Sequence, residues 1–263
     1  MVRASVPFLA IGALVAPIAA AASCDEALLQ QAADDYLAAQ TDGSTTQLTL
    51  LADGALYTEN FNNTDISTGI LSQALKIDRN TTLYDTTNCA TYTELIVTDP
   101  SHPYVIGVQQ RLTDGKLTDI GTIVTDQGDW QFNATGYLYW ASKEEWGEIP
   151  EDERDSREVI QAAADAYADL FNDSSVIVPW GTPCDRLEGG VYVGNGSATD
   201  SCDVDVPTDI PMTNRRYVID ESKGSVDVFL LFGGEIPDSH EFRIEKGKIR
   251  YVHTMTGDLS ALG

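Results

Sequence analysis

Six basic side chains lie close together near the end of the chain, in the segment PDSHEFRIEKGKIRYVHTMTG at 237–257. They are His240, Arg243, Lys246, Lys248, Arg250 and His253. They include two of the three histidines and four of the sixteen lysines and arginines. Imidazole can transfer protons near neutral pH, and guanidinium can stabilise negative charge that develops on an oxygen atom. The segment therefore predicts either a site for acid–base chemistry or the polar face of a final pair of strands.

Side-chain alternation along two such strands divides the segment into two faces. The first face carries Phe242, Ile244, Ile249, Tyr251, His253 and Met255, and the second carries Arg243, Arg250, Val252 and Thr254. If the first, mostly apolar face lines a pocket, His253 is its polar member and Tyr251 is the nearest aromatic neighbour. The pattern then predicts that His253 contacts a substrate oxygen, and a histidine that only satisfies its hydrogen bonds at a strand end is the alternative.

The two arginines of the second face, Arg243 and Arg250, are expected to form ion pairs with acids that hold the sheet together. If the assignment of residues to the two faces is wrong by one position, these arginines and His253 exchange faces, and Arg250 would then bind the substrate.

Three further residues are candidates for the site. His240 follows Asp238 by two residues, and a neighbouring carboxylate can raise the pKa of an imidazole into the range of a general acid. The same pair in a turn could also be an ordinary local contact. Trp180 and Tyr217 are candidate aromatic walls, although each could equally belong to the core.

The composition narrows the classes of partner. The chain has sixteen Lys and Arg against forty-one Asp and Glu, with a formal net charge of −25. Such a protein is a poor partner for phosphate backbones and anionic membrane surfaces, so nucleic acid is excluded as a ligand. Hydrophobic residues make up 43% of 263 residues, which is enough for a packed core in one large or two small domains. The composition is also compatible with a homodimer.

The N-terminal segment, residues 1–22, has the pattern of a secretory signal peptide. Arg3 precedes an apolar run from Val6 to Ala19, and small residues follow at Ala20 and Ala22. A membrane anchor is the alternative, but the run is shorter than the roughly 20 residues that a span requires. The mature chain is therefore expected to be secreted or lumenal, with no membrane span.

Four cysteines follow this segment, which is the even number expected in an oxidising compartment. They are Cys24, Cys89, Cys184 and Cys202, and three pairings are open. We favour Cys24 with Cys89 and Cys184 with Cys202, because each bond then lies within one half of the chain. No Cys-x-x-Cys or close His-Cys spacing occurs, so no metal site is expected.

The chain also contains five Asn-x-Ser/Thr sequences, which are acceptors for N-linked glycans. Their asparagines are Asn62, Asn80, Asn133, Asn172 and Asn195. Together they predict glycosylated surface loops.

The order of elements is similar in the two halves. An amphipathic helix is predicted at 25–42, ending at Gly43, and a second at 156–173, where Ser156 is a candidate cap. Strand-like runs follow the first helix at 90–99, 103–115, 116–130 and 136–141, and follow an irregular stretch after the second at 215–224, 225–234, 240–247 and 248–257. The charged segment 143–155 is an exposed connection, so the predicted units are 23–150 and 151–263. Short turns between the strands indicate antiparallel sheets and an α+β class.

A helix followed by a curved antiparallel sheet resembles the cone-shaped fold of the nuclear transport factor 2-like and SnoaL-like proteins. The ending HEFRIEKGKIRYVHTM, residues 240–255, is similar to the final strand pair of that superfamily. The resemblance implies two tandem cone-shaped units, each a helix packed on a curved antiparallel sheet.

The segments VPWGTPCDRLEGG, NRRYVIDESKGSVDVF, PDSHEFR and RYVHTMT of the second half resemble a family of secreted fungal proteins. YLAAQTDG, CATYTELI and GDWQFNATGYLYWA resemble its N-terminal part. Members with a known activity are hetero-Diels-Alderases of tropolone sesquiterpenoid biosynthesis. The resemblance implies a cofactor-free enzyme that dehydrates a hydroxymethyl tropolone to an ortho-quinone methide and directs its [4+2] addition to a humulene-type alkene.

Such chemistry requires a proton donor at the leaving oxygen, a cation near the tropolone oxygens and a dry, mostly aromatic pocket. The catalytic residues that we expect are His253, Arg250 and His240, and the expected substrate-binding residues are Tyr251, Trp180, Tyr217 and Arg243. The alternative function is that of a secreted, glycosylated protein that binds a hydrophobic ligand without catalysis.

Overall fold

The computed structural model describes residues 24–204 and 206–262, so the predicted signal peptide at 1–22 lies outside the described residues. The first half contains α1 (Glu26–Asp42), β1 (Leu51–Glu59), β2 (Asn62–Asn63), β3 (Arg79–Asp85), β4 (Ala90–Val97), β5 (Tyr104–Thr113), β6 (Lys116–Thr125) and α2 (Ala134–Ala141). The second half contains α3 (Arg157–Leu170), β7 (Trp180–Glu188), β8 (Val191–Val193), β9 (Met212–Asp220), β10 (Ser225–Phe232), β11 (Ile236–Glu245) and β12 (Lys248–Thr256).

The two sheets have equivalent topologies. The first has the strand order β2-β1-β6-β5-β4-β3, and the second has the order β8-β7-β12-β11-β10-β9. In each sheet the first long strand runs parallel to the last one, β1 beside β6 and β7 beside β12, and the other neighbours are antiparallel. The predicted α+β class with two tandem units is therefore confirmed.

The two long helices form where the sequence predicts them. Asp25 caps α1 by accepting a hydrogen bond from the Leu28 backbone at 3.0 Å, and Gly43 ends the helix in the left-handed conformation. In α3, Ser156 occupies the capping position, but its hydroxyl donates to Glu158 at 2.8 Å instead of capping the backbone. Each helix covers one face of its own sheet and buries Tyr36 or Tyr167 there.

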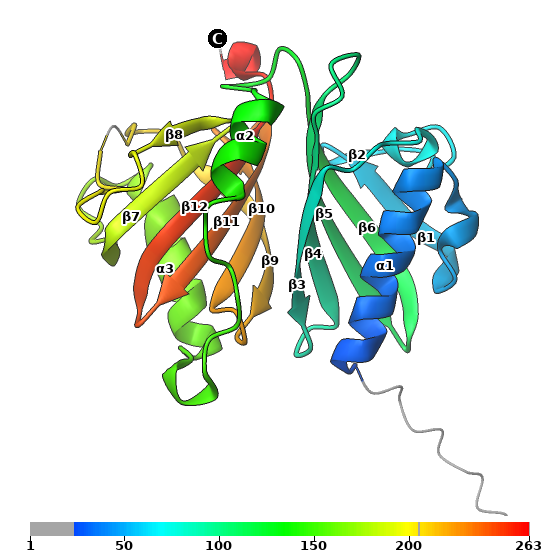
Figure 1. Cartoon of the computed structure of the whole chain (residues 1–263), viewed down its shortest axis with the longest axis horizontal. Helices are drawn as coiled ribbons and strands as arrows, with labels where there is room; N and C mark the ends of the chain where they lie inside the picture. Colours follow the sequence, from blue (N-terminus) through cyan, green and yellow to red (C-terminus); the bar gives the residue numbers. More distant parts are fainter. Residues whose placement is uncertain (1–23, 205, 263) are drawn as a thin grey trace, which may run out of the picture.

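The other faces of the two sheets meet at the junction between the halves. Figure 1 shows the sheets side by side, with β3 next to β9 at the centre and with α1 and α3 on opposite outer sides. A shared core fills this junction, and its side chains include Tyr92, Ile96, Val218, Phe229 and Met255. The halves are thus joined by a continuous apolar layer in addition to the chain itself.

Several elements differ from the sequence predictions. Residues 136–141 belong to helix α2 and not to a strand, because Ala134, Tyr137 and Ala141 are buried at helical spacing. The segment around Trp180, which we interpreted as irregular, is strand β7; its ladder with β12 is interrupted around Pro183, where a proline is tolerated. The strands β1 and β3 were not predicted.

The two disulfides join Cys24 to Cys89 and Cys184 to Cys202, the pairing that we favoured. Two disulfides are typical of proteins in an oxidising extracellular or lumenal compartment. Within the described part of the chain, no helix is both long and apolar enough to cross a membrane. All five sequon asparagines are exposed.

Candidate functional site

A bulge in β12 sets which side chains of the C-terminal segment face the site. The pairing of β12 with β11 shifts between the pairs Arg243–Tyr251 and Ile244–Ile249, so Arg250 is an extra residue on β12. Ile249 and Val252 therefore both pack under α3, whereas Met255 lies in the junction core. A bulge places two successive residues where regular alternation allows one, so the face reverses from Tyr251 onward. The predicted assignment of Phe242, Ile244 and Ile249 to one face is correct, and that of Tyr251, His253 and Met255 to the same face is wrong.

The face under α3 contains a cavity of about 290 Å³. Aromatic side chains form much of its wall, and polar groups come mainly from β7, β11 and β12. The lining residues are Trp130, Tyr167, Phe171, Arg186, Glu188, Pro207, Ile210, Phe232, Asp238, His240, Thr254, Thr256 and Leu259. A largely apolar cavity with a few converging polar groups is typical of a small-molecule site.

A histidine–carboxylate pair lies on this cavity. His240 Nδ1 is 3.3 Å from Asp238 Oδ2, and both residues are buried. Thr256 donates a hydrogen bond to the other Asp238 oxygen at 3.2 Å. Burial raises the pKa of Asp238, although the His240 imidazole acts in the opposite direction. Neither of these two atoms makes a hydrogen bond to any residue that the structure describes, so the imidazole and the carboxyl group lie side by side at the edge of an apolar space, which is a suitable position for general acid catalysis.

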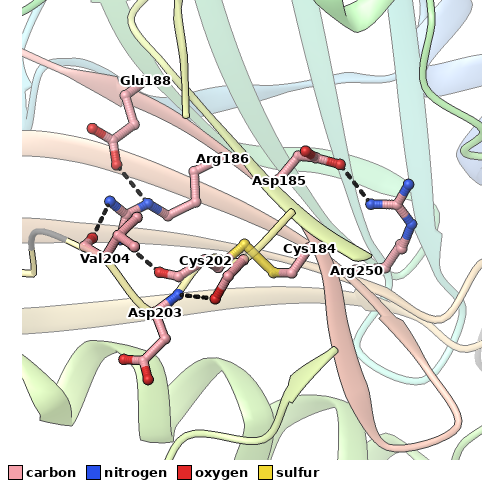
Figure 2. Close-up of a disulfide and its surroundings, with 9 residues drawn as sticks. Cys184, Asp185, Arg186, Glu188, Cys202, Asp203, Val204 and Arg250 are labelled. Atoms are coloured by element: carbon pink, nitrogen blue, oxygen red, sulfur yellow. Dashed lines mark hydrogen bonds and ion pairs between the residues drawn. A yellow bond between two sulfur atoms is a disulfide. The ribbon is translucent and has the colours of Figure 1, made fainter. Parts of the chain in front are cut away.

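A buried arginine supplies a cation on the same cavity. Arg186 Nε is 3.0 Å from Glu188 Oε1, and its two terminal nitrogens donate to the Cys202 and Val204 carbonyls at 3.1 and 2.7 Å. Figure 2 shows that the Cys184–Cys202 disulfide holds the segment that carries these carbonyls beside β7. The guanidinium is thus held by Glu188 on β7 and by the loop that the disulfide ties to β7.

His253, the principal candidate from the sequence, lies outside the cavity. It is 2% exposed and faces the junction, where Nδ1 is 2.9 Å from Glu94 Oε2 and Nε2 is 2.6 Å from Glu144 Oε2. Burial lowers its pKa, but the charges of Glu144 and Glu94 outweigh that effect and raise it well above its ordinary value. Tyr137 donates to Glu94 at 2.7 Å, and the Trp146 indole donates to Glu144 at 2.8 Å.

The predicted arginines also lie away from the cavity. Arg250 pairs with Asp185 at 2.8 Å and lies over the ring of Tyr251, which stacks with Trp146. Arg243 donates to the Gly147 and Lys223 carbonyls and pairs with Glu245 at 3.0 Å. Both arginines thus form ion pairs within the second sheet.

The two residues predicted as aromatic walls contact neighbours of the cavity without lining it. Trp180 contacts the edge of the cavity residue Tyr167, with ring centroids 5.7 Å apart. The Tyr217 hydroxyl donates to Asp165 on α3 at 2.6 Å. Neither residue lines the cavity, so of the predicted catalytic and substrate-binding residues only His240 does.

The sequence analysis missed most of the cavity wall. Tyr167 and Phe171 were visible as members of the apolar stripe of α3, but nothing in the stripe distinguishes a cavity wall from filled core. Arg186 carried a weak signal, because it stands two residues after a cysteine and two before Glu188. Pro207 and Ile210 come from an irregular loop whose position depends on the disulfide.

Comparison with known proteins adds little about activity. A family described as a domain of unknown function (DUF8021) matches residues 153–256, from α3 through β12. No curated protein matches the chain. A crystal structure of a presumed isomerase from Rhodopseudomonas palustris is 13% identical and covers 37% of this chain and 88% of its own, with a TM-score of 0.27. A similarity of that size carries no argument about fold or function.

Proposed function

We propose that the protein is a secreted enzyme that binds a small, largely apolar, oxygen-bearing molecule in the cavity under α3. The observation that carries this proposal is the buried His240–Asp238 pair on a cavity with aromatic walls. Arg186 adds a guanidinium on the same cavity, ion-paired with Glu188. Proton transfer and charge stabilisation could therefore act on one bound oxygen function.

The reaction that we propose is dehydration of a hydroxymethyl tropolone followed by stereoselective hetero-Diels–Alder addition to a humulene-type alkene. His240 would protonate the leaving hydroxyl, and Asp238 would balance the charge of the imidazolium. Arg186 would bind the substrate as the tropolonate, whose oxygen electron pair would form the ortho-quinone methide as the C–O bond of the hydroxymethyl group breaks. The leaving hydroxyl would depart as water with the His240 proton, and His240 would regain a proton from solvent. The apolar wall would protect the ortho-quinone methide from water and expose one of its faces to the alkene, which would approach at the cavity opening.

The resemblance of several segments to the fungal hetero-Diels-Alderases supports this reaction. The cavity volume, about 290 Å³, is near the lower limit of about 300 Å³ for ligand sites, so it suits one ring-sized partner beside the histidine. We also propose the finer fold assignment, a pair of nuclear transport factor 2-like cones, on the basis of a helix that covers one face of each sheet. His253 and Arg250 are assigned structural roles because neither lines the cavity.

Binding of a hydrophobic ligand without catalysis is the second candidate, and the predominantly aromatic and aliphatic wall favours it. The experiment is incubation of the purified protein with a hydroxymethyl tropolone and a humulenol, with product ratio and optical purity compared with buffer alone. Tropolone binding is measured in parallel by isothermal titration calorimetry.

His240→Gln and Asp238→Asn are expected to retain binding and to lose roughly 10²-fold or more of the rate. His102→Gln is the matched control, because His102 is 53% exposed and lies in the other half. Binding without acceleration by the wild type would establish the second candidate. A wild type that neither binds nor accelerates would contradict both.

A further inference from the structure

A second group of polar side chains lies in the junction between the sheets. Glu94 from β4, Glu241 from β11 and His253 from β12 are all buried, and each can present one ligand atom so that the three atoms lie within 4.8 Å of one another. Glu241 and His253 are direct cross-strand neighbours, and Glu94 reaches them from the opposite sheet. Three strands of fixed register thus direct possible metal ligands to one point.

We propose that Glu94, Glu241 and His253 bind one divalent transition-metal ion, with Zn²⁺ as the best match. One imidazole nitrogen and two carboxylates form a ligand set that Zn²⁺ accepts, with bond lengths of about 2.0–2.2 Å. Mg²⁺ and Ca²⁺ prefer sites made of oxygen ligands alone. His253 Nδ1 and Glu94 Oε2, which are 2.9 Å apart, would separate by about 0.4 Å to become neighbouring ligands of a tetrahedral Zn²⁺ ion.

The groups around these three residues resemble an outer coordination shell. His253 Nε2 lies 2.6 Å from Glu144, which fixes the ring with Nδ1 toward the proposed ion. Trp146 donates to the same Glu144 oxygen, and Tyr137 donates to Glu94. Metal-binding histidines commonly use the second ring nitrogen to bind a carboxylate in this way, and ligating carboxylates are themselves hydrogen-bonded.

An independent observation comes from Tyr92. Its hydroxyl is fully buried and makes no hydrogen bond of normal geometry with the described residues, although Ser239 lies near it. The charges of Asp227, Glu241 and Glu94 all act on this hydroxyl. Buried hydroxyls normally have a partner, and a water molecule on the open coordination position of the ion would provide one.

The charge of the cluster supports a cation. Glu94, Glu144 and Glu241 are buried around one imidazole, and carboxylates in a protein interior are usually paired or bound to metal. The ion would replace the proton between His253 and Glu94 and would connect β4 of the first sheet to β11 and β12 of the second. The site would therefore fasten the two halves to each other.

The test uses the mature protein, dialysed against a chelator and titrated at pH 7 with Zn²⁺, Co²⁺ and Mg²⁺ by calorimetry. We expect one Zn²⁺ or one Co²⁺ per chain, a Co²⁺ absorption spectrum typical of nitrogen and oxygen ligands, and no binding of Mg²⁺. Zn²⁺ is also expected to raise the thermal unfolding temperature.

Three variants make the result specific. Glu241→Gln keeps the shape of the ligand and the His253–Glu94 contact, and it should abolish binding of the one ion. Glu144→Gln should weaken binding by roughly 10–100-fold, as loss of an outer-shell partner does. Asp119→Asn, which alters a carboxylate paired with Arg216, should bind as the wild type does.

Circular dichroism is recorded first to check that each variant folds. If Glu241→Gln fails to fold, Zn²⁺ binding by Glu144→Gln is compared with that of the wild type instead. A wild type that binds no ion, or a folded Glu241→Gln protein that binds Zn²⁺ unchanged, would overturn the proposal. Because His240 is not a ligand, His240→Gln should bind Zn²⁺ normally, which separates this test from that of the proposed activity.

Discussion

His253 and Glu94 are 159 residues apart in the sequence, yet His253 Nδ1 lies 2.9 Å from Glu94 Oε2 in the buried junction. The contact joins β12 of one sheet to β4 of the other. Glu144 binds the second nitrogen of the same ring, so one imidazole contacts two carboxylates from the first half of the chain. This relationship makes His253 a central polar contact between the halves.

Replacing His253 by Gln should destabilise the metal-free protein by about 3–5 kcal/mol, because Glu94 and Glu144 would keep buried charges without a cation. Urea unfolding at pH 7 measures the change. His102→Gln, at an exposed position, should remain within about 0.5 kcal/mol of the wild type. A loss below about 1 kcal/mol in His253→Gln would show that the pair does not support the junction.

A second ion pair crosses the junction between Arg157 at the start of α3 and Asp85 at the end of β3. The two guanidinium nitrogens donate to the two Asp85 oxygens at 2.8 and 2.6 Å, and Asp85 is fully buried. Arg157→Gln should lower the free energy of unfolding by about 2–3 kcal/mol. The loss is smaller than for a fully buried ion pair, because Arg157 retains some solvent contact. Lys246→Gln, which breaks a well-exposed pair with Glu153, is the control and should have almost no effect in the same denaturant titration.

Asp227 should make stability depend on pH. Burial raises its pKa to about 8, although hydrogen bonds from Gln109 and Ser239 act in the opposite direction. Below about pH 4 both the folded and unfolded states carry the proton, so the group does not change the free energy of unfolding. As the pH rises toward 8, the unfolded state loses the proton first, and the free energy of unfolding falls by at most about 4 kcal/mol between pH 5 and 8.

Asp227→Asn should remove this slope, since the Ser239 hydroxyl can reverse and accept from the new amide while Gln109 continues to donate to the remaining oxygen. Urea unfolding at pH 5, 6.5 and 8 compares the two proteins. An unchanged slope in the variant would mean that other groups cause the pH dependence.

The sequence predicted the elements whose signals are local. The caps and apolar stripes gave α1 and α3, and short turns gave the antiparallel strands from β4 to β6 and from β9 to β12. The disulfides followed from the division of the chain into halves. These features depend on neighbours within a few residues or on a simple count, so no knowledge of the tertiary fold was necessary.

The candidate site was harder to predict, because its geometry depends on one irregularity and on distant partners. The bulge at Arg250 reverses the face of β12 and moves His253 from the expected pocket into the junction. Strand alternation contains no signal for such a bulge. Glu144 appeared in a charged run that is normally solvent-exposed, and only the packing of the preceding helix α2 brings it to His253.

The Cys184–Cys202 disulfide offers a test of how the cavity is built. It closes a loop with a sequence separation of 18, which stabilises the fold by roughly 3 kcal/mol in the chain-entropy account. The same loop supplies the carbonyls that hold Arg186 and leads into the cavity residues Pro207 and Ile210. Replacing both cysteines by Ser should therefore weaken tropolone binding at a temperature at which the variant is still folded.

The Cys24–Cys89 disulfide provides the matched control for this experiment. It encloses a longer loop, with a sequence separation of 65, so its removal should lower the unfolding temperature at least as much. Both of its cysteines belong to the first half and neither lines the cavity, so tropolone affinity, measured by isothermal titration calorimetry, should not change. Equal losses of affinity in the two double variants would indicate a general effect of stability. A loss confined to Cys184→Ser/Cys202→Ser would show that the tethered loop shapes the binding site.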